Sequence, residues 1–167
     1  MIHAIVAVVL LQSGMKQQAI LPAKDSGNLP FTLSVPQSWL VKGVWPVPKD
    51  TEDGFVHLCG GKNTLTLSLQ KYASSSLSNV LSSFAVPKKK HPDRYFSVKV
   101  PAGQGALILV PISHESGIRG APRDLITGRI YCGSNRVLFY EYSFFDRKAT
   151  VDDRKLMLSI LQTVKLK

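Results

Sequence analysis

The tract GRIYCGSNRVLFYEYSFF, residues 128–145, constrains the fold of this chain more than any other stretch. Its pattern predicts two strands, residues 125–132 and 136–145, joined by the turn Gly133-Ser134-Asn135. Glycine and asparagine tolerate the positive φ that a tight reversal needs, and Ile, Val, Tyr and Phe favour strands. Because the second strand carries apolar or aromatic residues on both faces, we expect it in the middle of a sheet, with other elements packed on each side.

Strands joined by tight turns recur along the rest of the chain. Alternating apolar residues predict strands at 29–36, 55–59, 64–72, 95–100 and 106–112. A helix is expected at 74–86, with Pro87 ending it and a basic loop at 88–92, and a second helix from Thr150 or Asp152 to the last residues. This order predicts an α+β fold, in which helices pack on the faces of a mainly antiparallel sheet of about six strands.

The apolar run Met1–Leu11 bears on the location of the protein. The run is too short to cross a bilayer as a helix, but it suits the apolar centre of a secretory signal, although no Lys or Arg precedes it and no Ala-x-Ala site follows. We therefore expect a signal peptide at 1–14, a polar linker at 15–28 and one domain at 29–167. This predicts a secreted or periplasmic protein without a transmembrane span in the mature chain; the alternative is a cytoplasmic protein in which the run is buried.

The charge of the chain is its one compositional oddity, with 21 Lys and Arg against 11 Asp and Glu, a net charge of +10. Much of this charge is scattered singly, which favours a solvated exterior over a dedicated patch. Nucleic-acid binding would need aromatic residues interleaved with cations on one face, and the aromatic residues beside Lys88-Lys89-Lys90 and Arg94, which are Tyr95 and Phe96, are expected in a strand, as part of the core. Arginine makes bidentate contacts with carboxylates and phosphates, so a groove for an anion is a hypothesis for the later arginines, which are Arg119, Arg123, Arg129 and Arg136.

Reactive side chains show little catalytic patterning. The four histidines have no metal-ligand spacing, and no glycine-rich loop is followed by a helix, so we expect neither a metal nor a cofactor. His57 and Cys59 share one face of a predicted strand, but packing within the strand explains them better than a nucleophile pair does. Cys59 and Cys132 form a disulfide in one interpretation of an exported protein, and in the other they are two separate thiols that behave as small hydrophobes.

Three segments resemble the PsbP-like family, whose fold is shared with the Mog-type Ran-binding proteins. FTLSVPQSW, residues 31–39, is similar to the opening strand-Pro-x-x-Trp pattern of that family, and LSILQTVK, residues 158–165, to its last helix and final segment. Residues 128–145 resemble its late central hairpin. The resemblance implies an α/β/α sandwich around a twisted antiparallel sheet and a mostly non-enzymatic role, and it supplies no binding residues.

These features together predict an exported, non-catalytic module that binds a partner protein or a small anionic ligand. One alternative is a cytosolic chaperone for secreted effectors, which would retain Met1–Leu11. The other alternative is a small thiol-dependent hydrolase centred on Cys59 and His57.

Overall fold

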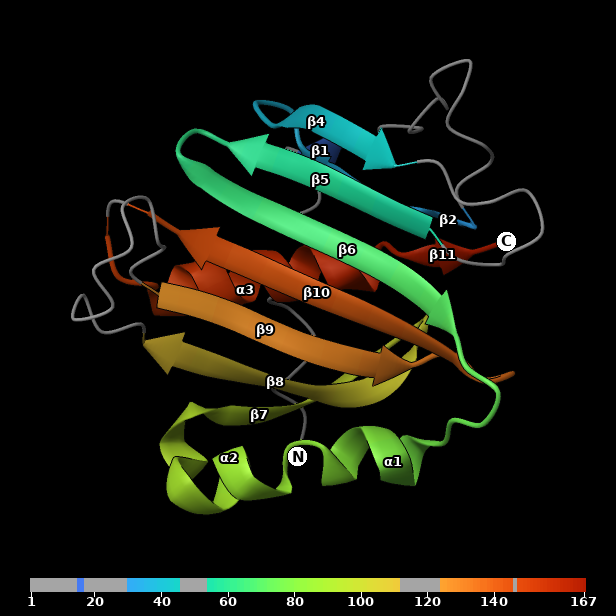
Figure 1. Ribbon diagram of the computed structural model, residues 1–167. Helices are drawn as coiled ribbons and strands as arrows, with labels where there is room; N and C mark the ends of the chain where they lie inside the picture. Colours follow the sequence, from blue (N-terminus) through green and yellow to red (C-terminus); the bar gives the residue numbers. More distant parts are fainter. Residues whose placement is uncertain (1–14, 17–29, 46–53, 112–123, 146) are drawn as a thin grey trace, which may run out of the picture.

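The computed structural model describes residues 15–16, 30–45, 54–111, 124–145 and 147–167. The predicted signal peptide at 1–14 and most of the predicted linker lie outside the described residues. The centre is a seven-stranded sheet in the order β4-β5-β6-β10-β9-β8-β7 (Figure 1), and each neighbouring pair is antiparallel. The prediction of a mainly antiparallel α+β fold is therefore confirmed, with one strand more in the main sheet than expected.

The strands of the main sheet are β4 (Leu40–Trp45), β5 (Gly54–Gly60), β6 (Asn63–Lys71), β7 (Tyr95–Val100), β8 (Gly103–Pro111), β9 (Asp124–Tyr131) and β10 (Arg136–Phe144). Two smaller sheets each pair two-residue strands: β1 (Met15–Lys16) with β3 (Val35–Pro36), and β2 (Phe31–Thr32) with β11 (Lys165–Leu166). The strand predicted for residues 29–36 is thus divided into two. Between the two parts, the Ser34 backbone N–H donates to the Thr163 hydroxyl at 2.8 Å instead of joining a strand ladder.

Helix α3 (Val151–Gln162) packs against the side chains that alternate strand positions direct to one face of the sheet. Leu67 of β6 and Leu138 and Tyr140 of β10 are buried in one cluster with Met157 and Ile160 of α3. The predicted closing helix is confirmed at its start, where the Thr150 side chain caps it, but not at its end, because the helix stops at Gln162 and Lys165–Leu166 form β11. Trp39 lies against the end of β5: its ring leaves no room for a Cβ at Gly60, and its centroid is 5.4 Å from that of the tilted Tyr142 ring.

The helix expected at 74–86 is instead divided into α1 (Leu77–Ser82) and α2 (Ala85–Lys90), followed by the 3₁₀ turn η2 (Pro92–Arg94). Pro87 does not end a helix, because it lies in the first turn of α2, where the missing N–H would have no intrahelical partner. The expected basic loop at 88–92 was likewise wrong, since Lys88, Lys89 and Lys90 form the last turn of α2.

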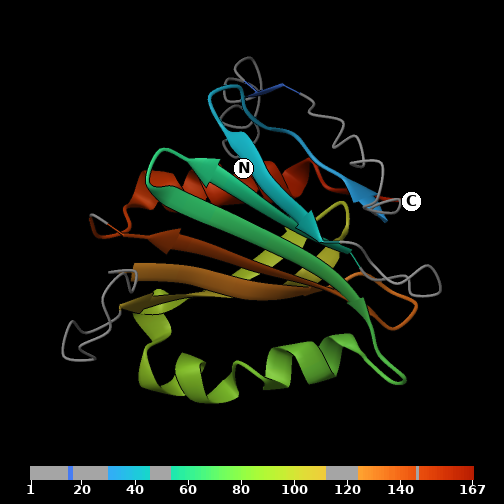
Figure 2. The same ribbon diagram turned by 45° about the horizontal axis from the view of Figure 1, so that its top comes forward.

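Helices α1 and α2 lie along the β7–β8 end of the sheet, whereas α3 runs behind its β6–β10–β9 part (Figures 1 and 2). A second, smaller cluster fixes them there: Phe84, between the two helices, is buried against Ala106 and Ile108 of β8. Of the helices within the described ranges, none combines the length and the apolar character needed to cross a bilayer.

Candidate functional site

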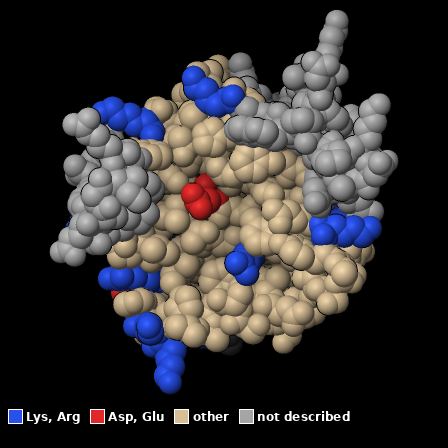
Figure 3. All heavy atoms as spheres, viewed as in Figure 1, with Lys and Arg blue, Asp and Glu red and all other residues tan. Residues whose placement is uncertain are grey.

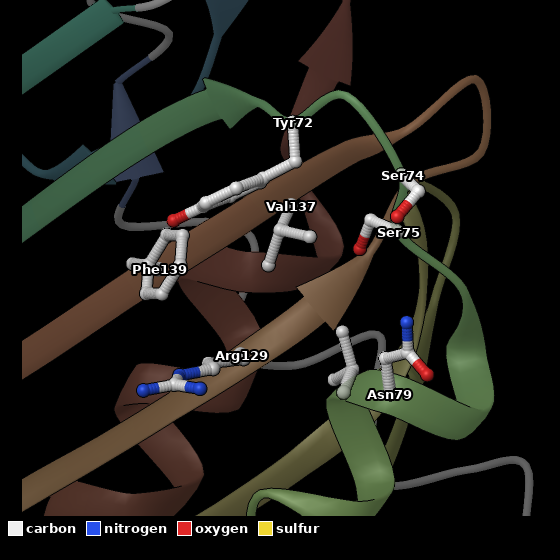
Figure 4. Close-up of a pocket in the computed structure, with 8 residues that line it drawn as sticks. Tyr72, Ser74, Ser75, Asn79, Arg129, Val137 and Phe139 are labelled. Atoms are coloured by element: carbon white, nitrogen blue, oxygen red, sulfur yellow. The ribbon is translucent and has the colours of Figure 1, made fainter.

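A pocket of about 200 Å³ lies where α1 approaches strands β9 and β10 (Figure 4). In this view Val137 lies in the middle of the pocket, Arg129 on one side and Asn79 on the other. The residues that line the pocket are Tyr72, Ser74, Ser75, Asn79, Val80, Arg129, Val137 and Phe139.

Strand alternation explains why the β9 and β10 side chains of the pocket point away from α3. Leu138 and Tyr140 are buried on the α3 side, so Val137 and Phe139 project from the opposite face. Arg129 is the direct cross-strand neighbour of Phe139, and its Cζ lies 5.1 Å from the centroid of the Phe139 ring. The Tyr72 ring is 6.1 Å from the same ring. The pocket thus joins one cation to two aromatic side chains.

The β9–β10 turn holds in place the segment with Ser74 and Ser75, which lies on the side of the pocket away from Arg129 (Figure 4). Gly133, Ser134 and Asn135 have φ values of 79°, 49° and 61°, so the predicted turn with positive φ is confirmed. The Asn135 carbonyl accepts a hydrogen bond from the Tyr72 N–H at 3.0 Å, and its side-chain oxygen accepts one from the Ser75 N–H at 3.3 Å. The Asn135 amide nitrogen donates to the Ala73 carbonyl at 3.4 Å. These bonds fix the segment that presents Ser74 and Ser75.

Arg129 has the properties of an anion-binding residue. Its side chain is exposed and makes no salt bridge with an acidic residue of the described ranges. Glu141, on the same face of β10, accepts a hydrogen bond from the Ser143 hydroxyl at 3.3 Å. A guanidinium offers two parallel donors to a carboxylate or phosphate, and serine hydroxyls and an asparagine amide add further donors.

The volume of the pocket limits what it can hold. Pockets for drug-sized ligands run from about 300 to 1,000 Å³, so this one suits a single charged group with a small apolar part rather than a large cofactor.

The four predicted arginines do not form one groove among the described residues. Arg136 begins β10 on the α3 side, where it donates to the Lys167 carbonyl at 3.4 Å, so it faces away from Arg129. The Arg136 Nε is buried without a hydrogen-bond partner. Arg119 and Arg123 lie outside the described residues. Arg129 and Arg136 therefore lie on opposite faces of the β9–β10 hairpin, because Arg129 pairs with Phe139 and side chains alternate between the faces from Phe139 back to Arg136.

Sequence reasoning missed the rest of the pocket. Tyr72, Phe139, Ser74, Ser75 and Asn79 were assigned only to strands, turns or a helix. The register of the predicted hairpin would have paired Phe139 with Arg129, but nothing local in the sequence brings the residues that follow β6 to the same place.

His57 and Cys59 lie on one face of β5, as alternation predicts. Leu58, which lies between them in sequence, is fully buried on the opposite face. The His57 Nδ1 is 3.1 Å from the Thr66 hydroxyl, and no hydrogen bond joins His57 to Cys59 in the described parts of the chain. Within those same parts, no group of three His, Cys, Asp or Glu side chains could hold a metal ion.

Cys59 and Cys132 are both free thiols, so the disulfide considered from the sequence is not formed. The sheet order explains why: Cys59 is in β5 and Cys132 follows β9, and β6 and β10 lie between these strands. Burial raises the pKa of the Cys132 thiol to about 11, outweighing a hydrogen bond from the Leu138 backbone and the charge of Arg136.

Comparison of the chain with models of protein families, with curated proteins and with solved structures finds no match. The PsbP-like resemblance therefore stays a prediction from the sequence.

Proposed function

We propose that this protein is an exported, non-catalytic binding module, whose pocket around Arg129 takes a carboxylate or phosphate group of a partner protein or of a small ligand. The observation that carries this proposal is the exposed Arg129 guanidinium, stacked on Phe139 at 5.1 Å and without an acidic partner among the described residues. A guanidinium held against an aromatic ring loses less conformational freedom on binding than a free one, so its fork is already oriented for an anion.

We extend this proposal to the PsbP-like α/β/α arrangement implied by the resemblance. Two contacts support it. Helix α3 packs with Leu138 and Tyr140, and Phe84 packs with Ala106 and Ile108, which flank Leu107 on β8. Export is supported by the composition of residues 1–14. The chaperone and the thiol-dependent hydrolase stay alternative predictions.

Titration of the ¹⁵N-labelled protein with benzoate tests the pocket, because benzoate combines a carboxylate with a ring that can stack on Tyr72 and Phe139. A peptide ending in phenylalanine with a free carboxylate presents the same groups as part of a partner protein, and the amidated peptide lacks the charge. We expect amide shifts along residues 72–79 and 129–139 with benzoate or the free-carboxylate peptide, and no binding of the amidated one. Tighter binding of the peptide would identify a protein partner, and equal binding a small ligand.

The Arg129→Gln variant should bind at least about tenfold more weakly, since a hydrogen bond to a charged group is worth roughly 1.5–3 kcal/mol. The affinity of the Arg129→Lys variant should fall between those of the wild type and Arg129→Gln, because lysine keeps the charge but loses the two parallel donors of the guanidinium. Arg154 is the matched control: its Cζ lies 3.9 Å from the Phe96 centroid, so it is also an arginine stacked on a phenylalanine, but outside the pocket. Wild-type affinity in Arg129→Gln, or an equal loss in Arg154→Gln, would contradict the proposal.

A further inference from the structure

A second groove, of about 300 Å³, lies between α2 and the end of β8. Apolar residues form most of its lining, and three residues that carry or can acquire positive charge complete it. The lining residues are Val86, Pro87, Ile108, Leu109, Val110, Pro111, Lys90, His91 and Arg94. Val86 is 63% exposed, so the apolar wall continues onto the surface.

The floor of this groove includes an open strand edge. Strand β7 pairs with β8 from Val100 opposite Gly103 up to Tyr95 opposite Ile108, and no further. Strand β8 continues to Pro111, and Leu109 and Val110 pair there with β9 alone among the described strands. Backbone groups on the β7 side of this end therefore lack a strand partner in the described part of the chain. Such an edge accepts an added strand from an extended peptide.

The charge around the groove is positive. Lys88, Lys89 and Lys90 occupy the last turn of α2, and basic side chains gather at the corresponding corner of the molecule (Figures 1 and 3). Asp93, whose carboxylate is 3.8 Å from the Arg94 Nε, is the acidic residue next to them. Lys88 lies over the Tyr95 ring at 5.0 Å. An occupant with apolar and acidic side chains would complement this surface.

We propose that this groove is a docking surface for an extended acidic segment of a partner protein, which adds a short strand to β8 beyond the start of β7. Its apolar side chains pack against Val86 and Pro87, and its carboxylates pair with Lys90 and Arg94. An anionic membrane surface could bind the same charges, but it has no backbone that could pair with the open strand edge. The extended peptide therefore fits this surface better. This surface is separate from the Arg129 pocket, and the inference does not depend on the proposed function.

A peptide of alternating valine and glutamate with both ends blocked is the probe, with binding measured by fluorescence anisotropy and mapped by ¹⁵N chemical shifts. We expect shifts at residues 86–94 and 108–111, and an affinity that falls as salt screens the charges. The same peptide with every backbone amide N-methylated keeps its charge and side chains but has no N–H to donate along either edge. Its binding should be lost. A peptide with lysine in place of glutamate should not bind either.

Two variants test the residues. Lys90→Gln combined with Arg94→Gln, and separately Val86→Glu, should each weaken peptide binding by about tenfold or more, the scale of a well-placed interface residue. Lys155→Gln is the matched control, because Lys155 is an exposed lysine on α3, paired with Asp152 at 3.1 Å. Val86, Lys90 and Lys155 are exposed and Arg94 is half-buried, and unchanged thermal melting would show that the variants fold.

Equal binding of the N-methylated peptide would overturn the added strand. Vesicles of phosphatidylserine that bind through Lys88–Lys90, with no binding of the peptide, would overturn the proposal in favour of a membrane surface. Absence of shifts at residues 108–111 at saturating peptide would overturn it as well.

Discussion

At the scale of single residues, Asp153 is the side chain on which the start of α3 most depends. Its carboxylate accepts hydrogen bonds from Nη1 and Nη2 of Arg147 at 2.6 and 2.7 Å, and from the Thr150 N–H and hydroxyl, each at 2.7 Å. Burial by itself would raise the pKa of Asp153, but the hydrogen bonds from Arg147 and Thr150 and the charge of Arg147 outweigh it and lower that pKa. The ionised carboxylate is thus favoured in the folded protein.

Asp153→Asn should lower the free energy of unfolding at pH 7 by about 1–3 kcal/mol, through loss of the cap and of the charge-assisted bonds. Because the folded-state pKa is lowered, this stabilisation is present above the unfolded-state pKa near 4 and is lost as the pH falls through the folded-state value. Urea unfolding at pH 7 and at about pH 3 should therefore show a smaller difference between variant and wild type at the lower pH. Asp152→Asn, an exposed neighbour, is the control and should change little. A constant difference across this pH range would refute the assignment.

Cys132 offers a second test at the same scale. With a pKa raised to about 11, only about a thousandth of its thiol is ionised at pH 8, and the thiolate is the reactive form. In the Cys59→Ala variant, Cys132 should react with iodoacetamide at least about a hundredfold more slowly than free cysteine, as followed by intact mass. Reaction at the rate of free cysteine would show that Cys132 is neither buried nor desolvated as described.

At the scale of elements, the β9–β10 turn does two jobs, because it reverses the chain and holds the segment after β6. Asn135→Ala removes the side-chain bonds to Ser75 and Ala73 and also places an alanine at a φ of 61°. Asn135→Gly removes the same bonds without backbone strain. We expect the free energy of unfolding to fall in the order wild type, Asn135→Gly, Asn135→Ala, with steps of about 1 kcal/mol each.

Urea denaturation measures this order, and Ser134→Gly is the control. Ser134 has a φ of 49° and its side chain is exposed, so this variant should be as stable as the wild type or slightly more stable. If Asn135→Gly and Asn135→Ala were equally stable, the positive φ at Asn135 would carry no cost, contrary to the description of the turn.

Elements with an unbroken period were predictable, and those shaped by distant contacts were not. The β9–β10 hairpin and α3 were predicted because period and turn or cap residues agree along each. Strand β4 was missed, since a register shift between Val41 and Gly43 breaks its alternation. Helix α2 was not predicted because proline inside a helix usually ends it. Pro87 lies in the first turn of α2, where proline is tolerated. In the pocket, Arg129 was predicted and Tyr72 was not, because only the sheet order brings them together.

At the scale of the whole molecule, the apolar residues form two clusters of unequal size. The larger one joins α3 to the main sheet, and the smaller one consists of Phe84, Ala106 and Ile108, with Tyr95 and Val110 packed against it. Helices α1 and α2 are six residues each, too short to be stable in isolation. They therefore depend on the smaller cluster for their place on the sheet.

This division affects both the Arg129 pocket and the groove beside β8. Helix α1 supplies Asn79 and Val80 to the Arg129 pocket, and α2 supplies Val86 and Pro87 to the groove beside β8. Detachment of residues 77–90 from the sheet would disrupt both proposed binding sites in a single event. An occupant of either proposed site would oppose that event, so thermodynamic linkage predicts a higher affinity at the other site without direct contact.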